Sequence, residues 1–135
     1  MEIFNYFLAI LIFGGILYLD VLSDYQRWKE NKSLPHFKQW VQRILLLSPS
    51  ILLLSIPNLD ITTLTISSLL EGSTWLLLFD GFYNKIRGFD WWFMGSIDKD
   101  ESWWDKIQRK IPLKLLKVLK IGVPILLLII FIING

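Results

Sequence analysis

Four long apolar runs constrain this chain more than any other feature of its sequence. They cover residues 3–19, 44–56, 61–79 and 121–133, and Glu71 is the one charged residue inside them. A helix needs about 20 apolar residues to cross a bilayer. The first and third runs come close, whereas the second and fourth reach this length only with their flanking turns and with cationic side chains extended to the interface. The chain is therefore predicted to be an all-α integral membrane protein.

The whole chain is expected to form one transmembrane domain of four helices. Counting the flanking turns places them at about residues 3–19, 40–56, 61–79 and 113–133, with loops at about 20–39 and 80–112. The first helix is expected to continue to about Glu30, because neither Gly nor Pro follows its apolar run. Pro49 is expected to kink the second helix, with hydroxyl groups satisfying the freed carbonyl. The alternative is that the two short runs form re-entrant or interfacial helices.

The distribution of positive charge favours four spans. All 14 Lys and Arg residues lie between residues 27 and 43 or between residues 85 and 120. With four spans these two segments face the same side of the membrane, and with three spans they face opposite sides. Basic segments of membrane proteins collect on the cytoplasmic side. We therefore expect a multi-pass protein of the bacterial inner membrane, with both loops cytoplasmic and both termini outside.

The composition argues against several kinds of chemistry. The chain has no cysteine, which excludes disulfides, thiolate metal sites and thiol nucleophiles. Its single histidine, His36, argues against a histidine-built metal site or catalytic triad. We expect no metal, no cofactor and no nucleic-acid partner. Glu2 and the lack of a basic leader indicate that the first run is not a cleavable signal peptide.

Five lysines precede the last apolar run at spacings of 4, 4, 3 and 3: Lys106, Lys110, Lys114, Lys117 and Lys120. This spacing places them on one face of a helix. It predicts a basic amphipathic helix that lies on the cytoplasmic leaflet before the last span. Its simplest role is to anchor the topology. The alternatives are binding of anionic lipid headgroups, which attract nearby cations, and docking of an acidic partner.

Glu71 lies at the middle of the third run. An ionised carboxylate there costs about 3 kcal/mol or more, so this group is expected to be protonated or directed toward a polar partner. Ser67, Ser68 and Thr74 lie within one turn of it. Small and hydroxyl side chains permit close helix contact in lipid. The simplest interpretation is a bond across a helix interface, within the chain or between subunits, and the alternative is a proton or cation pathway.

Glycines, aromatic residues and charges alternate between residues 80 and 96. Trp and Tyr favour the membrane interface, so an interfacial loop or short re-entrant helix is the simplest prediction. The functional alternative is a site for a headgroup or partner that uses Asp80, Arg87, Trp91 and Trp92.

The stretch from Leu78 to Asp98 reads LFDGFYNKIRGFDWWFMGSID. It is similar to a segment of uncharacterised small polytopic membrane proteins of bacteria and their phages. The resemblance implies a membrane location and transfers no functional residues.

Three functions stay open at this point. The first is a non-enzymatic adaptor or subunit of a membrane assembly, which binds a membrane protein partner or anionic lipid through its aromatic and basic loop and associates with a second copy of itself through its third helix. The second is a holin-like or small pore-forming oligomer that uses Glu71. The third is a lipid-headgroup-modifying enzyme, whose cluster would be Asp20, Asp24, Asp80 and Arg87. Asp20 and Asp24 are one turn apart and could hold Mg²⁺ or pair with nearby cations. The enzyme has the least support, because none of these groups has a diagnostic spacing.

Overall fold

The computed structural model describes residues 2–30, 32, 36–93 and 103–134. Its elements are the helices α1 (Glu2–Lys29), α2 (His36–Ser55), η1 (Ile56–Asn58), α3 (Ile61–Ile86), α4 (Trp103–Lys110) and α5 (Leu113–Asn134). The described part of the chain contains helices and no strand. The all-α prediction is confirmed, and α1 ends within one residue of its expected end.

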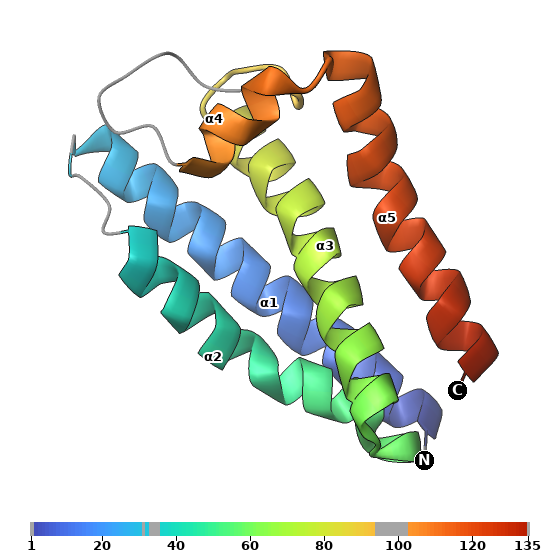
Figure 1. Cartoon of the computed structure of the whole chain (residues 1–135). Coiled ribbons are helices and arrows are strands. Elements are labelled where there is room, and N and C mark those ends of the chain that lie inside the picture. Colours follow the sequence, from blue (N-terminus) through green and yellow to red (C-terminus); the bar gives the residue numbers. More distant parts are fainter. Residues whose placement is uncertain (1, 31, 33–35, 94–102, 135) are drawn as a thin grey trace.

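The helices form an up-and-down bundle (Figure 1). α1 and α2 pack as an antiparallel pair, and α3 contacts both of them as well as α5. The two termini lie at one end of the bundle, near the start of α3 (Figure 1). The opposite end is formed by the last turns of α1 and α3, the first turns of α2 and α5, and the short helix α4.

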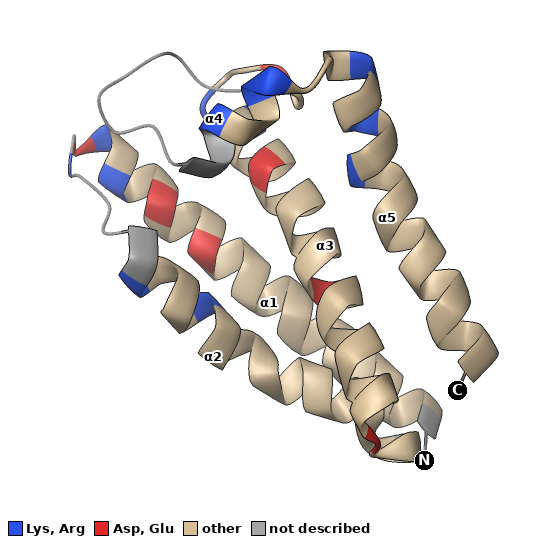
Figure 2. Cartoon of the chain, in the orientation of Figure 1, with Lys and Arg blue, Asp and Glu red and all other residues tan. Residues whose placement is uncertain are grey.

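Charged residues gather at the end that lies away from the termini (Figure 2). We call it the charged end. Both basic segments meet there, because α2 runs from the charged end back to η1 before α3 returns. At the other end, Asp60 caps α3: its carboxylate accepts hydrogen bonds from the backbone N–H groups of Thr62 and Thr63, at 2.7 and 3.0 Å. These bonds hold the pKa of Asp60 below its usual range.

Three helical segments are long and apolar enough to cross a membrane: Ile3–Lys29, Ile61–Ile86 and Leu113–Asn134. The membrane-protein prediction is supported at this level. α2 is not among the three, because Lys38, Gln39 and Arg43 interrupt the apolar residues of its first half. A fourth span through α2 stays a prediction.

The outside of the bundle is apolar. Large apolar side chains are exposed along α1, α2 and α5, among them Phe4, Leu19, Leu45, Ile132 and Ile133. A continuous apolar surface of this kind marks contact with a partner or a membrane. Contact of this surface with lipid chains has no free-energy cost, whereas its contact with water is unfavourable.

The inside of the bundle follows one stripe of α3. Every fourth residue of this helix is buried, namely Thr63, Ser67, Glu71, Trp75 and Phe79. The spacing places them on one face, which meets α1 and α2. The polar half of the stripe lies toward the termini. The aromatic half joins Leu17, Val21 and Leu47 in the apolar core.

Pro49 lies inside α2 and is accommodated as expected. Proline has no N–H, so it leaves the carbonyl of Leu45 without its usual helical donor. The Oγ of Ser48 donates to this oxygen at 2.8 Å. The helix therefore continues through the proline to Ser55.

The five lysines before the last span do not share one helix. α4 ends at Lys110 and α5 begins at Leu113, so the expected basic face is divided between two helices. The break follows from Pro112, which lacks an N–H and disfavours the α conformation in the residue before it. Lys106 and Lys110 belong to α4, and the other three lysines belong to α5. Placement of α4 on a membrane surface stays a prediction.

Candidate functional site

Two buried polar contacts join the second half of α2 to α3. The Oγ of Ser50 donates to the Oε2 of Glu71 at 2.7 Å. The Oγ of Ser55 donates to the Oγ of Ser67 at 3.2 Å. Ser50 and Ser55 are fully buried. Of the alternatives for Glu71, the structure shows a bond across a helix interface within one chain.

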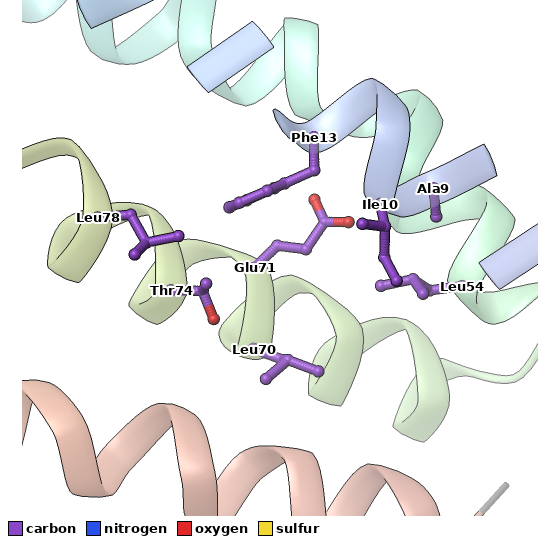
Figure 3. Close-up of a pocket in the computed structure, with 8 residues that line it drawn as sticks. All are labelled: Ala9, Ile10, Phe13, Leu54, Leu70, Glu71, Thr74 and Leu78. Carbon is purple, nitrogen blue, oxygen red and sulfur yellow. The ribbon is translucent and has the colours of Figure 1, made fainter. Parts of the chain in front are cut away.

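Glu71 also lines a cavity of about 280 Å³ (Figure 3). The walls come from α1, α2 and α3, and the other lining residues are Ala9, Ile10, Phe13, Leu54, Leu70, Thr74 and Leu78. The carboxyl group points toward α1, between Phe13 and Ile10 (Figure 3). Thr74 thus lies beside Glu71 as expected. Ser68 does not, because it is exposed and its Oγ donates to the carbonyl of Leu64 at 2.7 Å.

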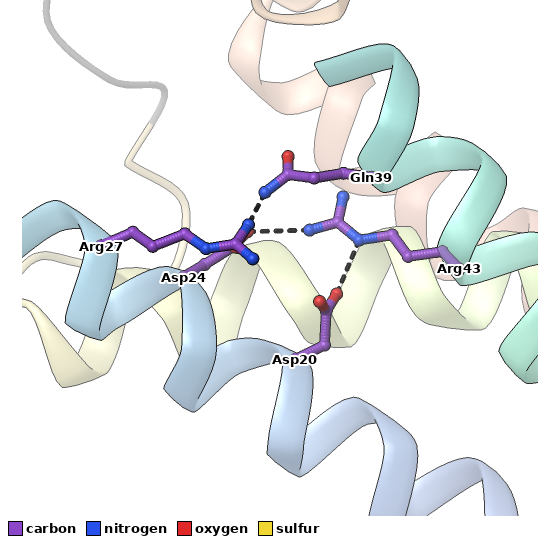
Figure 4. Close-up of polar contacts among 5 residues, drawn as sticks. All are labelled: Asp20, Asp24, Arg27, Gln39 and Arg43. Atoms are coloured by element: carbon purple, nitrogen blue, oxygen red, sulfur yellow. Dashed lines mark hydrogen bonds and ion pairs between the residues drawn. The ribbon is translucent and has the colours of Figure 1, made fainter. Parts of the chain in front are cut away.

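A second polar site joins α1 to α2 near the charged end (Figure 4). Arg43 donates from Nε to the Oδ2 of Asp20 at 2.6 Å and from Nη2 to the Oδ2 of Asp24 at 2.8 Å. Gln39 donates to the other oxygen of Asp24 at 3.0 Å, and Arg27 lies 3.8 Å from that oxygen. The two aspartates are therefore held by α2 rather than arranged around an open metal position.

Arg43 reaches α3 as well. Its guanidinium carbon lies 4.3 Å from the ring centre of Phe79 and 6.0 Å from that of Trp75. These are distances at which a cation and an aromatic face attract each other. Sequence reasoning assigned Arg43 to the basic segment and missed this role. A signal was present: Asp20 and Asp24 are four residues apart, and so are Gln39 and Arg43, which places each pair on one helix face.

Asp80 forms a contact with another helix of the protein. Its Oδ2 accepts a hydrogen bond from the Nζ of Lys120 at 2.6 Å, which ties α3 to α5. Lys120 is therefore engaged inside the bundle and does not extend the basic surface.

Arg87 is held by the end of its own helix. Its Nη2 donates to the Oδ1 of Asn84 at 2.8 Å, and its guanidinium carbon lies 4.1 Å from the ring centre of Tyr83 and 5.7 Å from that of Trp28. Asn84 in turn donates to the carbonyls of Trp91 and Phe93, at 3.1 and 2.8 Å. This network folds residues 87–93 back onto α3.

The two tryptophans of this segment pack against the protein. The indole of Trp91 lies so close to Gly81 that a Cβ at this position would overlap the ring. Trp92 lies under Lys117, whose Nζ is 5.3 Å from the ring centre. The aromatic part of the predicted binding loop thus has a structural role.

Lys106, Lys110 and Lys114 differ from the other predicted binding residues. All three are exposed, and none forms an ion pair with another residue that the structure describes. We call them the lysine patch. They lie on α4 and at the start of α5, at the charged end.

Each residue of the cluster suggested for a lipid enzyme contacts another residue of the protein. Asp20 and Asp24 bind Arg43, Asp80 binds Lys120, and Arg87 binds Asn84. Among the described residues no group of three acidic or histidine side chains is placed to hold a metal ion.

Comparisons with protein families, with curated proteins and with solved structures found no match to this chain. The resemblance of residues 78–98 to small bacterial and phage membrane proteins stays a prediction from sequence. Function has to be inferred from the contacts and charges of the chain itself.

Proposed function

We propose that this protein is a four-span, non-enzymatic adaptor of the bacterial inner membrane, whose lysine patch binds an acidic partner subunit in the cytoplasm. The observation that carries the proposal is that acidic residues near the charged end are engaged within the protein, whereas the lysine patch is not. Asp20, Asp24 and Asp80 are engaged in contacts between helices. The lysine patch is exposed and has no described acidic partner.

The fourth span of the proposal is α2. Its 20 residues give a length of about 30 Å, which matches the apolar thickness of a bilayer. It exposes Ile44, Leu45 and Leu52 to the surroundings of the bundle. The charge of Arg43, in the first half of α2, is compensated by the aspartates of α1. With four spans, both basic segments face the cytoplasm and both termini face outward.

The surroundings of Glu71 favour an adaptor over a holin-like pore. A pore for ions or water needs polar groups along its length. The cavity around Glu71 is lined by apolar side chains apart from Thr74. The carboxyl group bonds to Ser50 of the neighbouring helix, which is a packing contact. A buried polar contact between helices stabilises a bundle without a transport role.

Native mass spectrometry of the gently solubilised protein tests the adaptor proposal. We expect a second polypeptide to be bound to the wild-type chain. A triple variant with Lys106, Lys110 and Lys114 changed to Gln should lose it, because the attraction between the lysine patch and acidic side chains is removed. Anionic lipids are distinguished in the same spectrum by their small mass.

A charge-matched control changes three exposed lysines of the other basic segment, Lys29, Lys32 and Lys38, to Gln. It removes the same net charge and leaves the lysine patch intact, so the second polypeptide should stay bound. Two results would contradict the adaptor proposal. One is a wild-type chain that carries lipid alone, and the other is a partner that the patch variant retains.

A further inference from the structure

A carboxyl group and an aromatic ring line one apolar pocket between the helices, which opens on the outside of the bundle. Glu71 of α3 and Phe13 of α1 both line the 280 Å³ cavity. Figure 3 shows the carboxyl group directed into the space beside the Phe13 ring. This volume is near the lower end of small-molecule sites, roughly 300 Å³.

Glu71 has capacity for another partner. Ser50 is its only hydrogen-bond partner among the described residues, and it contacts Oε2 alone. No Lys or Arg is among the cavity-lining residues. Arg43, on the neighbouring helix, is already bound to Asp20 and Asp24. The described residues thus place an acidic group in the cavity and no cation beside it.

The ring of Phe13 is held in place beside this acid. It packs edge-on against Trp75, with ring centres 5.9 Å apart and planes at 90°. Trp75 is itself buried and stacked on Phe79. An ammonium group is attracted to the face of an aromatic ring, and the attraction grows where water is excluded. Acid and ring together recognise one class of ligand, an organic cation.

We propose that the Glu71 cavity binds a small organic ammonium cation with an apolar body. The ammonium group lies between the free Oε1 of Glu71 and the ring of Phe13. The apolar body packs on Leu54, Leu70 and Leu78, which line the rest of the cavity. This site is separate from the lysine patch, so the proposal does not depend on the adaptor function.

Equilibrium dialysis of the full-length protein in detergent micelles tests this site with a matched pair of ligands. Benzyltrimethylammonium is a permanent cation, and neopentylbenzene has the same shape with carbon in place of the charged nitrogen. Binding to empty micelles is subtracted. We expect the wild-type protein to bind the cation saturably, and Glu71→Gln to weaken this binding about tenfold or more, because the charge pair is lost. Binding of neopentylbenzene should not respond to this substitution.

Glu71→Gln keeps an oxygen that can accept the Ser50 bond, and its thermal unfolding shows whether the fold is retained. Glu30→Gln is the control, since it makes the same substitution at an exposed site. It should bind the cation as the wild type does. Phe13→Leu is the second test, and it should weaken cation binding about threefold or more while leaving neopentylbenzene unaffected. The proposal is overturned if the wild type does not bind the cation, or if Glu71→Gln or Phe13→Leu binds it as tightly as the wild type.

Discussion

At the scale of single residues, Arg43 connects three helices. It bonds to Asp20 and Asp24 of α1 from its position on α2, and its guanidinium lies over Phe79 of α3. Asp24 is only 3% exposed, so its charge depends on its partners, and Arg43 makes the shortest contact among them. A buried pair is weak evidence of net stabilisation, but removal of one member leaves an uncompensated buried charge.

Arg43→Met is therefore expected to lower the free energy of unfolding by about 3 kcal/mol. The stability of Arg43→Lys should lie between those of Arg43→Met and the wild type. Lys keeps the positive charge, but it cannot donate two hydrogen bonds from a planar group as Arg does. Lys38→Met is the control, since it removes an exposed cation from the same helix. Reversible unfolding in mixed micelles measures all three variants. Equal stability of Arg43→Met and Lys38→Met would show that the network does not hold the helices together.

Glu71 shows why one residue can have two roles in lipid. Its contact with Ser50 satisfies one carboxyl oxygen and fixes α2 against α3. The other oxygen has no hydrogen-bond partner among the described residues, and Glu71 lines the cavity. A helix-packing role and a binding role are therefore compatible at this position.

At the scale of elements, α3 is the central helix, and its far end is covered by its own continuation. Gly88 has a φ of +83°, a left-handed conformation that glycine adopts without strain, and it reverses the chain after the helix. Asn84 then binds the returning backbone, and Trp91 packs on Gly81. The close approach of the indole is possible because Gly81 has no side chain.

Gly81→Ala is expected to push Trp91 away and to release residues 87–93 from α3. Hydrogen exchange of the backbone amides in this segment should then become faster, because the contacts that cover it are lost. Gly72→Ala is the matched control in the same helix, where an added Cβ meets no neighbouring atom within 4 Å. It should leave exchange in residues 87–93 unchanged. Equal exchange in both variants would contradict the role given to Trp91.

At the scale of the whole molecule, α5 packs along α3, and two side-chain contacts tie it to the bundle. Lys120 binds Asp80 of α3 near the charged end, and Phe131 contacts Tyr6 of α1, with ring centres 6.1 Å apart. Between these points α5 exposes apolar residues such as Leu126 and Ile129. The bundle is thus an apolar body with a charged end, an arrangement that suits a protein held in a bilayer with that end in water.

The lack of native cysteine allows a direct test of the proposed four-span topology. Lys32→Cys, Asn58→Cys and Lys110→Cys each introduce a single thiol at an exposed position. In intact cells whose outer membrane has been made permeable, a membrane-impermeant maleimide should label Asn58→Cys alone. The other two thiols should react only after the inner membrane is permeabilised, because both lie at the charged end. If α2 does not cross the membrane, the thiols of Lys32→Cys and Asn58→Cys lie on the same side and are labelled under the same conditions. The thiol of Lys110→Cys then lies on the opposite side.

The sequence by itself determined the helices, because helix formation depends on neighbours along the chain. The apolar runs fixed the all-α class and the approximate positions of α1, α3 and α5. Glu71 could be singled out as a charge inside an apolar run. The one-sided distribution of lysine and arginine followed from the sequence as well, although the division of the lysine face at Pro112 was missed.

Only the tertiary structure decided which side chains meet. Arg43 finds Asp20 and Asp24 because α1 and α2 pack side by side, and no local rule specifies that packing. The same holds for Asp80 and Lys120, which join α3 to α5. The cavity beside Glu71 is a space left between three helices, so it depends on their packing rather than on any one segment. Short-range spacing sets the helices, and long-range packing sets the sites.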